Sequence, residues 1–265
     1  MIEIKNNGDK LVVFASIRPP AIYLDHWAVR EISSNPDLMA RFLKVFAQKG
    51  TLLFSVINSF DISGSKGEAL SKIEAFLDAV GENWFPLEIN PAKVIKAEKE
   101  YRQGANPPCF ADKLLEAYFP HIFSGRLSLK KTVALIEEEG DAGPISVSVG
   151  KTLDELAKAF ALFRSIKNST TNLWSRPPKV EEYVPARPTD YVYNGLTYFM
   201  LSEDFRLNRN HIADYFHAVV ALAYSDFVLL DKHWESMAAK IKLPRNIKVY
   251  SQPKISDFIR DLEAA

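Results

Sequence analysis

The alternation of hydrophobic and polar positions along the chain predicts an α/β protein. Short apolar runs, typical of strands that are buried on both faces, alternate with segments of helical periodicity. The predicted strands are 21–24, 51–57, 84–89, 227–230 and 247–250. The predicted helices between and after them are 38–48, 67–80, 91–102, 214–224, 234–241 and 255–263. This order predicts a three-layer α/β/α fold, in which helices cover both faces of a central, mainly parallel sheet.

Two segments depart from this alternation. Residues 2–14 alternate apolar and polar around Asn-Asn-Gly-Asp, which predicts an N-terminal β-hairpin with its turn at Asn7-Gly8. Residues 104–200 are rich in helical patterns and form a predicted helical insertion. We therefore expect one domain over residues 1–265, interrupted by this insertion. Its expected helices are 111–118, 128–139, 153–166 and 191–201, with a long loop at 169–188.

Composition narrows the classes of protein. Lys plus Arg and Asp plus Glu each number 33, which excludes a strongly basic protein that coats nucleic acid. A nuclease that gathers basic residues around an acidic site remains compatible with a net charge of zero. The single cysteine, Cys109, allows neither a disulfide framework nor a cysteine-based zinc site, and a free thiol is expected. No apolar run resembles a signal peptide or a membrane span, so we expect a cytoplasmic location and no membrane partner.

Acidic residues follow the predicted strands. Asp25 comes directly after 21–24 and Asp231 directly after 227–230, and a His-Trp pair follows closely in both places. Because side chains at the carboxyl ends of parallel strands converge on the ligand crevice, we expect these two acids to lie close together. Asp61, after 51–57, is expected at the same edge, and Asp214 reaches it from the first turn of the helix 214–224.

Four converging carboxylates have a clear chemical use. Asp25, Asp61, Asp214 and Asp231 could hold one or two Mg²⁺ or Mn²⁺ ions, which prefer oxygen ligands. Such ions activate water for phosphodiester cleavage, and without them the carboxylates would repel one another. The alternative interpretation is that Asp25 and Asp231 only cap helix N-termini. Asp226, which precedes a strand, is predicted to be a turn or capping residue.

Histidine and arginine residues accompany these acids. His211 and His217 flank Asp214. We predict that they hydrogen-bond to the metal-binding carboxylates without touching the metal, or that they simply pack against their neighbours. Arg206 and Arg209, just upstream of Asp214, are the candidates for contacts with substrate phosphates.

The sequences YLD at Asp25, FSVINSFD at Asp61 and HIADYFHAVVALAYSDFVLLD with Asp214 and Asp231 resemble the PIN-domain family of metal-dependent ribonucleases. Together with WFPLEINPAKVIKAEKE, they look like bacterial PIN-like proteins. The resemblance spans about residues 20–100 and 205–255. It implies cleavage of single-stranded RNA with Mg²⁺ or Mn²⁺, four catalytic aspartates, and metal ligation by Asp25, Asp214 and Asp231. An inhibitory protein partner and a homodimer are further expectations.

Two departures from the family pattern leave alternatives open. The second acid is usually a glutamate, so Glu68 or Glu98 could take the place of Asp61. The last strand usually ends in Thr or Ser two residues before the acid, whereas this chain has Leu229 there. A catalytically degenerate PIN-like module that binds RNA or a protein partner is therefore the alternative function.

Overall fold

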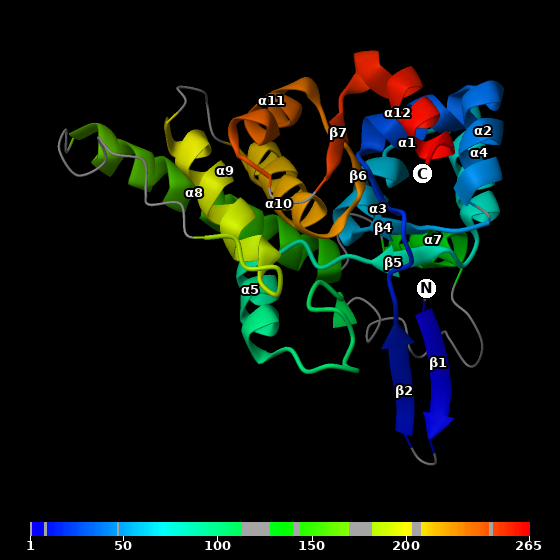
Figure 1. The fold of residues 1–265 in the computed structure, drawn as a ribbon, viewed down its shortest axis with the longest axis horizontal. Coiled ribbons are helices and arrows are strands. Elements are labelled where there is room, and N and C mark those ends of the chain that lie inside the picture. Colours follow the sequence, from blue (N-terminus) through cyan, green and yellow to red (C-terminus); the bar gives the residue numbers. More distant parts are fainter. Residues whose placement is uncertain are drawn as a thin grey trace.

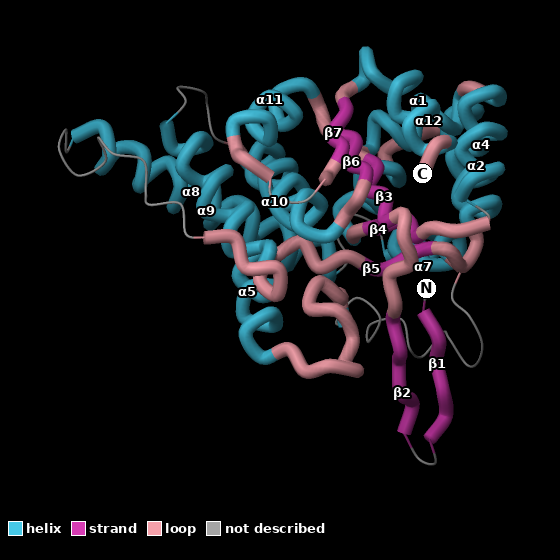
Figure 2. Tube along the Cα trace, viewed as in Figure 1, coloured by secondary structure: helices cyan, strands magenta, loops and turns pink. Residues whose placement is uncertain are grey.

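A parallel sheet of five strands forms the centre of the molecule. The computed structural model describes residues 2–7, 10–46, 48–112, 128–139, 144–169, 182–202, 208–243 and 246–265. The strand order is β5-β4-β3-β6-β7, and all four neighbouring pairs are parallel (Figures 1 and 2). The strands are β3 (Ala21–Leu24), β4 (Thr51–Phe54), β5 (Trp84–Pro86), β6 (Phe227–Leu229) and β7 (Lys248–Tyr250). The predicted α/β class with a mainly parallel sheet is confirmed.

Successive strand residues point to opposite faces of the sheet, and each face carries its own hydrophobic core. Ile22 and Leu24 of β3 enter one core, whereas Ala21 and Tyr23 enter the other. Helices cover the first core on the right in Figure 1: α1 (His26–Ser34), α2 (Pro36–Phe46), α4 (Glu68–Val80), α7 (Leu129–Glu139) and α12 (Ile255–Glu263). The second core lies under α5 (Pro91–Glu100), α8 (Pro144–Ser169), α9 (Pro188–Ser202), α10 (Arg209–Tyr224) and α11 (Lys232–Lys240).

Helix α10 is the central helix of the second layer. It is apolar nearly all round and is buried from Tyr215 to Ala223, as a helix with neighbours on every side should be. Helices α8 and α9, from the predicted insertion, pack directly against α10. In the part of the chain that the structure describes, the insertion helices therefore extend the second core. None of the described helices is both long and apolar enough to span a bilayer.

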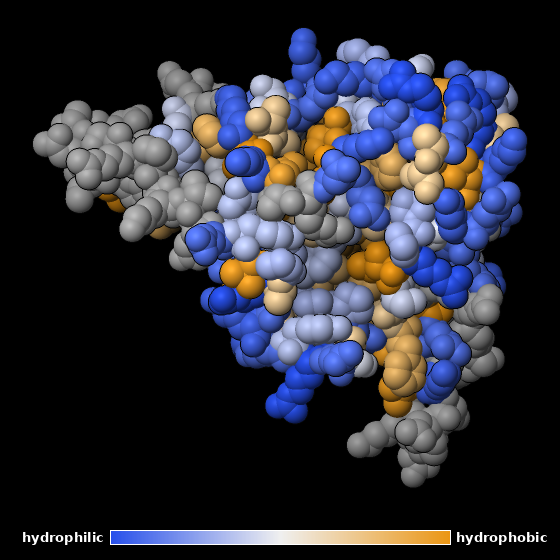
Figure 3. All heavy atoms as spheres, viewed as in Figure 1, coloured by the Kyte–Doolittle hydropathy of each residue, from blue (hydrophilic) through white to orange (hydrophobic). Residues whose placement is uncertain are grey.

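The predicted N-terminal hairpin is present. Strands β1 (Ile2–Asn7) and β2 (Lys10–Ala15) pair antiparallel in a separate sheet and extend away from the body (Figures 1 and 2). The side chain of Asn106 bonds to the C-terminal end of β2: its amide nitrogen donates to the Val13 carbonyl, and its amide oxygen accepts from the Ala15 N–H. Hydrophobic atoms appear along the described part of the hairpin in Figure 3, and Phe14 is 45% exposed. Gly8 of the predicted turn lies outside the described residues.

The predicted strand 51–57 is too long. Strand β4 ends at Phe54, Ser55 caps the following helix, and α3 (Val56–Ser63) begins at once. Val56 and Ile57, which follow Ser55, continue the apolar pattern of the strand, so the sequence pattern does not indicate that a helix begins there. Ser55 and Asn58 form a capping box, in which each side chain bonds to the backbone of the other residue.

Most other elements match their prediction within a few residues, although α8 begins nine residues before the predicted 153–166. The predicted helix 111–118 and loop 169–188 lie mostly outside the described residues. A short 3₁₀ turn, η2 (Gln252–Lys254), leads into α12.

Asp226 joins strands at the amino ends of the sheet. Its carboxylate accepts from the Ala21 N–H at 2.7 Å, and its own N–H donates to the Ala21 carbonyl at 2.7 Å. Its carbonyl accepts from the Lys248 N–H at 3.0 Å. Asp226 lies in the bend between α10 and β6, as the expected turn residue would, and in addition it connects β3, β6 and β7.

Replacing Asp226 with alanine should destabilise the fold by about 1–3 kcal/mol, because the Ala21 N–H loses its charged acceptor. Urea denaturation of wild type and variant measures this change. Asp78→Ala, on the exposed side of α4, is the matched control and should change stability by about 0.5 kcal/mol or less. Equal effects of the two substitutions would show that the strand connection contributes nothing.

Candidate active site

Asp25 and Asp231 stand at the carboxyl ends of neighbouring strands. Strands β3 and β6 pair Leu24 with Leu229, and the Asp25 N–H extends this ladder by donating to the Leu229 carbonyl at 3.1 Å. Each aspartate also caps a helix. The Asp25 carboxylate accepts from the His26 N–H at 2.7 Å, and the Asp231 carboxylate accepts from the Trp234 N–H at 2.8 Å. Both residues therefore cap helices as expected, and both lie at the predicted edge; whether they do more than cap is not decided by these hydrogen bonds.

Asp61 and Asp214 reach this edge from helices. Asp61 lies in the second turn of α3 and does not directly follow a strand, which corrects the prediction. Asp214 lies in the second turn of α10, because that helix begins at Arg209 and not at Asp214. Both side chains are partly buried.

Asp25, Asp61 and Asp231 are all close enough for their charges to act on Asp214. The pKa of Asp214 is raised from 3.8 to about 7, first by burial and then by the charges of Asp25, Asp231 and Asp61. The pKa of Asp61 is also raised, by burial and by Asp25, against the lowering effects of His26 and Arg30. We call Asp25, Asp61, Asp214 and Asp231 the acidic cluster.

The side-chain positions of the acidic cluster do not form a finished cation site. Among the described residues, no three His, Cys, Asp or Glu side chains are spaced to hold one metal ion. The donor set nevertheless fits Mg²⁺ or Mn²⁺ in its chemistry, because it consists of carboxylate oxygens. A divalent cation would also relieve the repulsion that raises the pKa of Asp214. Cation binding would require these side chains to approach one another.

The two alternative second acids lie elsewhere. Glu68 is the exposed first residue of α4 and pairs with Lys72 at 2.7 Å. Glu98 is buried in α5, where it accepts from the Tyr224 hydroxyl at 2.7 Å. Tyr224 is at the far end of α10, about 15 Å along the helix from Asp214. Asp61 is therefore the acid that the fold brings to the cluster.

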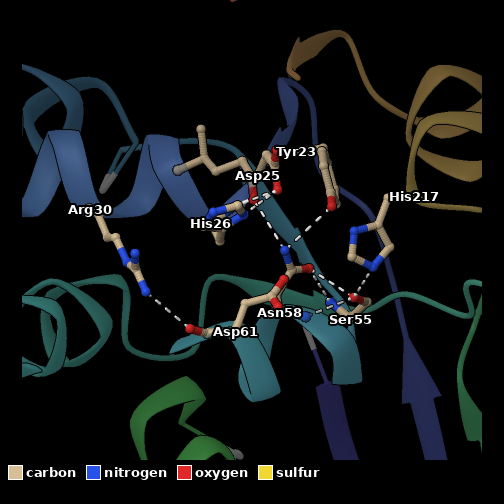
Figure 4. A network of polar contacts seen from close by, with 9 residues as sticks. Tyr23, Asp25, His26, Arg30, Ser55, Asn58, Asp61 and His217 are labelled. Carbon is tan, nitrogen blue, oxygen red and sulfur yellow. Dashed lines mark hydrogen bonds and ion pairs between the residues drawn. The ribbon is translucent and has the colours of Figure 1, made fainter. Parts of the chain in front are cut away.

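A buried group of polar side chains lies next to the cluster (Figure 4). We call Tyr23, Ser55, Asn58 and His217 the polar network. The Ser55 hydroxyl donates to Asn58 Oδ1 at 2.9 Å and lies 3.0 Å from His217 Nε2. Since Asn58 Oδ1 can only accept and the hydroxyl has one proton, Nε2 of His217 must be the donor to Ser55. Asn58 Nδ2 donates to the Tyr23 hydroxyl at 3.3 Å and to the Leu24 carbonyl at 3.4 Å.

The polar network positions the elements that carry the acids. Tyr23 precedes Asp25 by two residues, Asn58 precedes Asp61 by three on α3, and His217 follows Asp214 by three on α10. The network therefore joins β3, α3 and α10 beneath three of the four carboxylates. Tyr23 and Asn58 were not among the predicted site residues, although Asn58, three residues after Ser55, is a recognisable capping signal.

Of the two predicted roles, bonding to the carboxylates or packing, His217 shows packing. His217 bonds to Ser55 and packs its ring edge-on to Tyr23, and no carboxylate contact with it is found among the described residues. Burial lowers the pKa of His217 to about 4, so it is neutral at physiological pH. The charge of one cluster member, Asp231, acts on His211. Burial and His233 lower its pKa, and Asp231 raises it.

The contacts predicted for Arg206 and Arg209 with substrate phosphates stay a prediction, and the structure places another arginine beside Asp61. Arg206 lies outside the described residues, and the guanidinium of Arg209 is packed against Gly150 of α8. Arg30 of α1 is the arginine near the cluster, with Nη2 3.4 Å from the Asp61 carbonyl and 3.2 Å from Ser65 Oγ. His26 Nδ1 lies 3.1 Å from Asp25 Oδ1.

Comparisons with known proteins return no matching family model, no matching curated protein and no matching solved structure. The resemblance to the PIN-domain family therefore stays a prediction from the motifs around the four aspartates.

Asp214→Asn should stabilise the metal-free protein increasingly as pH rises. Between pH 3.8 and about 7, folded Asp214 holds a proton that the unfolded chain has lost, so wild-type stability falls across this window. Asparagine does not titrate, so the Asp214→Asn variant does not undergo this fall in stability with pH. The stability difference should therefore increase by roughly 1–4 kcal/mol between pH 4 and pH 8.

Urea denaturation in EDTA at several pH values measures this difference. The opposite titration of His217, whose pKa is about 4, is present in both proteins and cancels to first order. Asp37→Asn, on the exposed first turn of α2, is the control and should show a pH-independent difference. A pH-independent difference for Asp214→Asn would show that the pKa of Asp214 is not raised in the folded protein.

Proposed function

We propose that this chain is a divalent-metal-dependent endoribonuclease of PIN-like fold that cleaves single-stranded RNA. The observation that carries the proposal is the acidic cluster, in which β3, α3, α10 and the end of β6 bring four carboxylates to one edge of a parallel sheet. The charges of Asp25, Asp61 and Asp231 all act on Asp214. A cluster that repels itself in this way is expected where a cation completes the site.

Each acid has an assigned role in this proposal. Asp25, Asp214 and Asp231 would hold Mg²⁺ or Mn²⁺, and Asp61 would accept a hydrogen bond from the attacking water. The bound cation would lower the pKa of that water and offset charge on the phosphate. The polar network supports these roles, because its buried hydrogen bonds fix α3 and α10 against β3.

A second candidate function is a catalytically degenerate module that binds RNA or a protein partner. Specific observations favour it. Asp25 and Asp231 are both engaged as helix caps, and no three ligands in the described part of the chain have the spacing of a cation site. Leu229 also stands where the resembling family has a hydroxyl. An inhibitory partner and a homodimer remain expectations.

Asparagine substitutions in the acidic cluster should abolish RNA cleavage. Asp25→Asn and Asp231→Asn keep the capping oxygen but remove the charge, so the fold should persist while activity falls at least ~100-fold. Cleavage of a labelled single-stranded RNA with Mg²⁺ or Mn²⁺ measures this loss. Asp37→Asn should cleave as wild type does, and EDTA should stop cleavage. Cleavage by both asparagine variants at the wild-type rate would refute the proposal.

Thermal melts with and without Mn²⁺ separate the two candidate functions. For the nuclease, Mn²⁺ should raise Tm by linkage, by several degrees at saturation, and Asp214→Asn should lose this shift. For the degenerate module, Mn²⁺ should leave Tm unchanged. In that case Asp25→Ala should cost about 0.5–2 kcal/mol through the lost cap, whereas Asp25→Asn should cost almost nothing.

A further inference from the structure

Two basic side chains from one helix face the acidic cluster. His26 is the first residue of α1, and Arg30 follows one turn later, so the two lie on the same side of the helix. Both act on Asp61 by lowering its pKa, and His26 acts on Asp214 in the same direction. Figure 4 shows the two side chains beside Asp25 and Asp61.

Hydrogen bonds to neighbouring residues hold the side chains of His26 and Arg30 beside the acidic cluster. One nitrogen of Arg30, Nη2, bonds to the Asp61 carbonyl and to Ser65 Oγ on the following bend, which ties the guanidinium across α1 and α3. His26 Nδ1 faces Asp25, so its Nε2 is the ring nitrogen that points away from this carboxylate. The His26 side chain is 41% exposed, and Arg30 is exposed. Both can therefore offer a donor to a ligand in solution.

The acidic cluster needs such donors if it acts on RNA. A phosphodiester is an anion, and four carboxylates repel it unless positive groups stand beside them. The arginine chosen from the sequence, Arg209, has its guanidinium against Gly150 of α8. Two basic side chains of α1 act on the acidic cluster: His26 lowers the pKa of Asp61 and of Asp214, and Arg30 lowers the pKa of Asp61.

The geometry points to His26 and Arg30 as a clamp that binds a phosphodiester of single-stranded RNA next to the acidic cluster. This inference rests on the proposed function for its ligand. The guanidinium supplies a pair of donors suited to the non-bridging phosphate oxygens, and the imidazole supplies a third donor from the same side. Arg30 thus positions the substrate in addition to joining α1 to α3.

Equilibrium binding of a fluorescein-labelled oligouridylate, with Ca²⁺ in place of Mg²⁺, tests the clamp. Arg30→Gln and His26→Gln should each raise Kd about 5–20-fold, as expected for loss of a charge-assisted contact. Each lost phosphate contact should also reduce the slope of log K against log salt by about 0.7. Arg41→Gln on α2 is the control and should leave both quantities unchanged.

Arg30→Lys distinguishes the clamp from a purely structural connection. Lysine keeps the charge but loses the two-point geometry of the guanidinium, so it should restore the salt slope and part of the affinity. The clamp is refuted if Arg30→Gln and His26→Gln bind with the wild-type Kd and slope, or if wild type does not bind the oligonucleotide.

The experiments can refute the clamp proposal and the nuclease proposal independently of each other. If the acidic cluster variants cleave RNA as wild type does but binding still depends on Arg30, the nuclease proposal fails and the clamp stands. If cleavage depends on the acids while Arg30→Gln has unchanged binding and KM, the clamp alone fails.

Discussion

The hydroxyl of Ser55 connects the three elements on which the site depends. Ser55 follows β4, and its hydroxyl caps α3 by accepting a hydrogen bond from the Asn58 N–H. The same hydroxyl accepts a hydrogen bond from Nε2 of His217 on α10. All of these groups are buried, so any break would leave polar atoms without partners in a dry interior. These hydrogen bonds therefore favour the arrangement in which α3 and α10 meet β3.

Ionisation of the acidic cluster lowers the stability of the folded protein, although the neighbouring polar network raises it. Burial and neighbouring charges raise the pKa of Asp214 to about 7, which means that its ionised form is costly in the folded protein. Stability alone would select neutral side chains there. A hydrogen-bonded network beside ionisable groups that burial makes costly to charge is one reason for the proposal that these charges have a function.

The sequence predicted the parts of this structure that depend on local pattern. Ala21–Leu24 and Ile255–Glu263 match their predictions because alternation and helical periodicity are unambiguous there. Ser55 was predicted as strand because Val56 and Ile57 prolong an apolar run, and only tertiary bonds reveal its role. Arg30 was missed for a related reason. An arginine on an exposed helix face has no sequence signal until the fold places Asp61 opposite it.

Capping explains why the strand-end acids are positioned so firmly. A cap is bonded to the first turn of its helix, so the carboxylates of Asp25 and Asp231 are fixed by the backbone of α1 and α11. In addition, the Asp25 N–H is bonded to Leu229, which fixes the distance between the two helix starts. Each carboxylate has two oxygens and several lone pairs, so capping leaves acceptor capacity for a cation. A helix-capping role for these two residues is therefore compatible with cation binding, because a capping carboxylate keeps lone pairs that a cation could use.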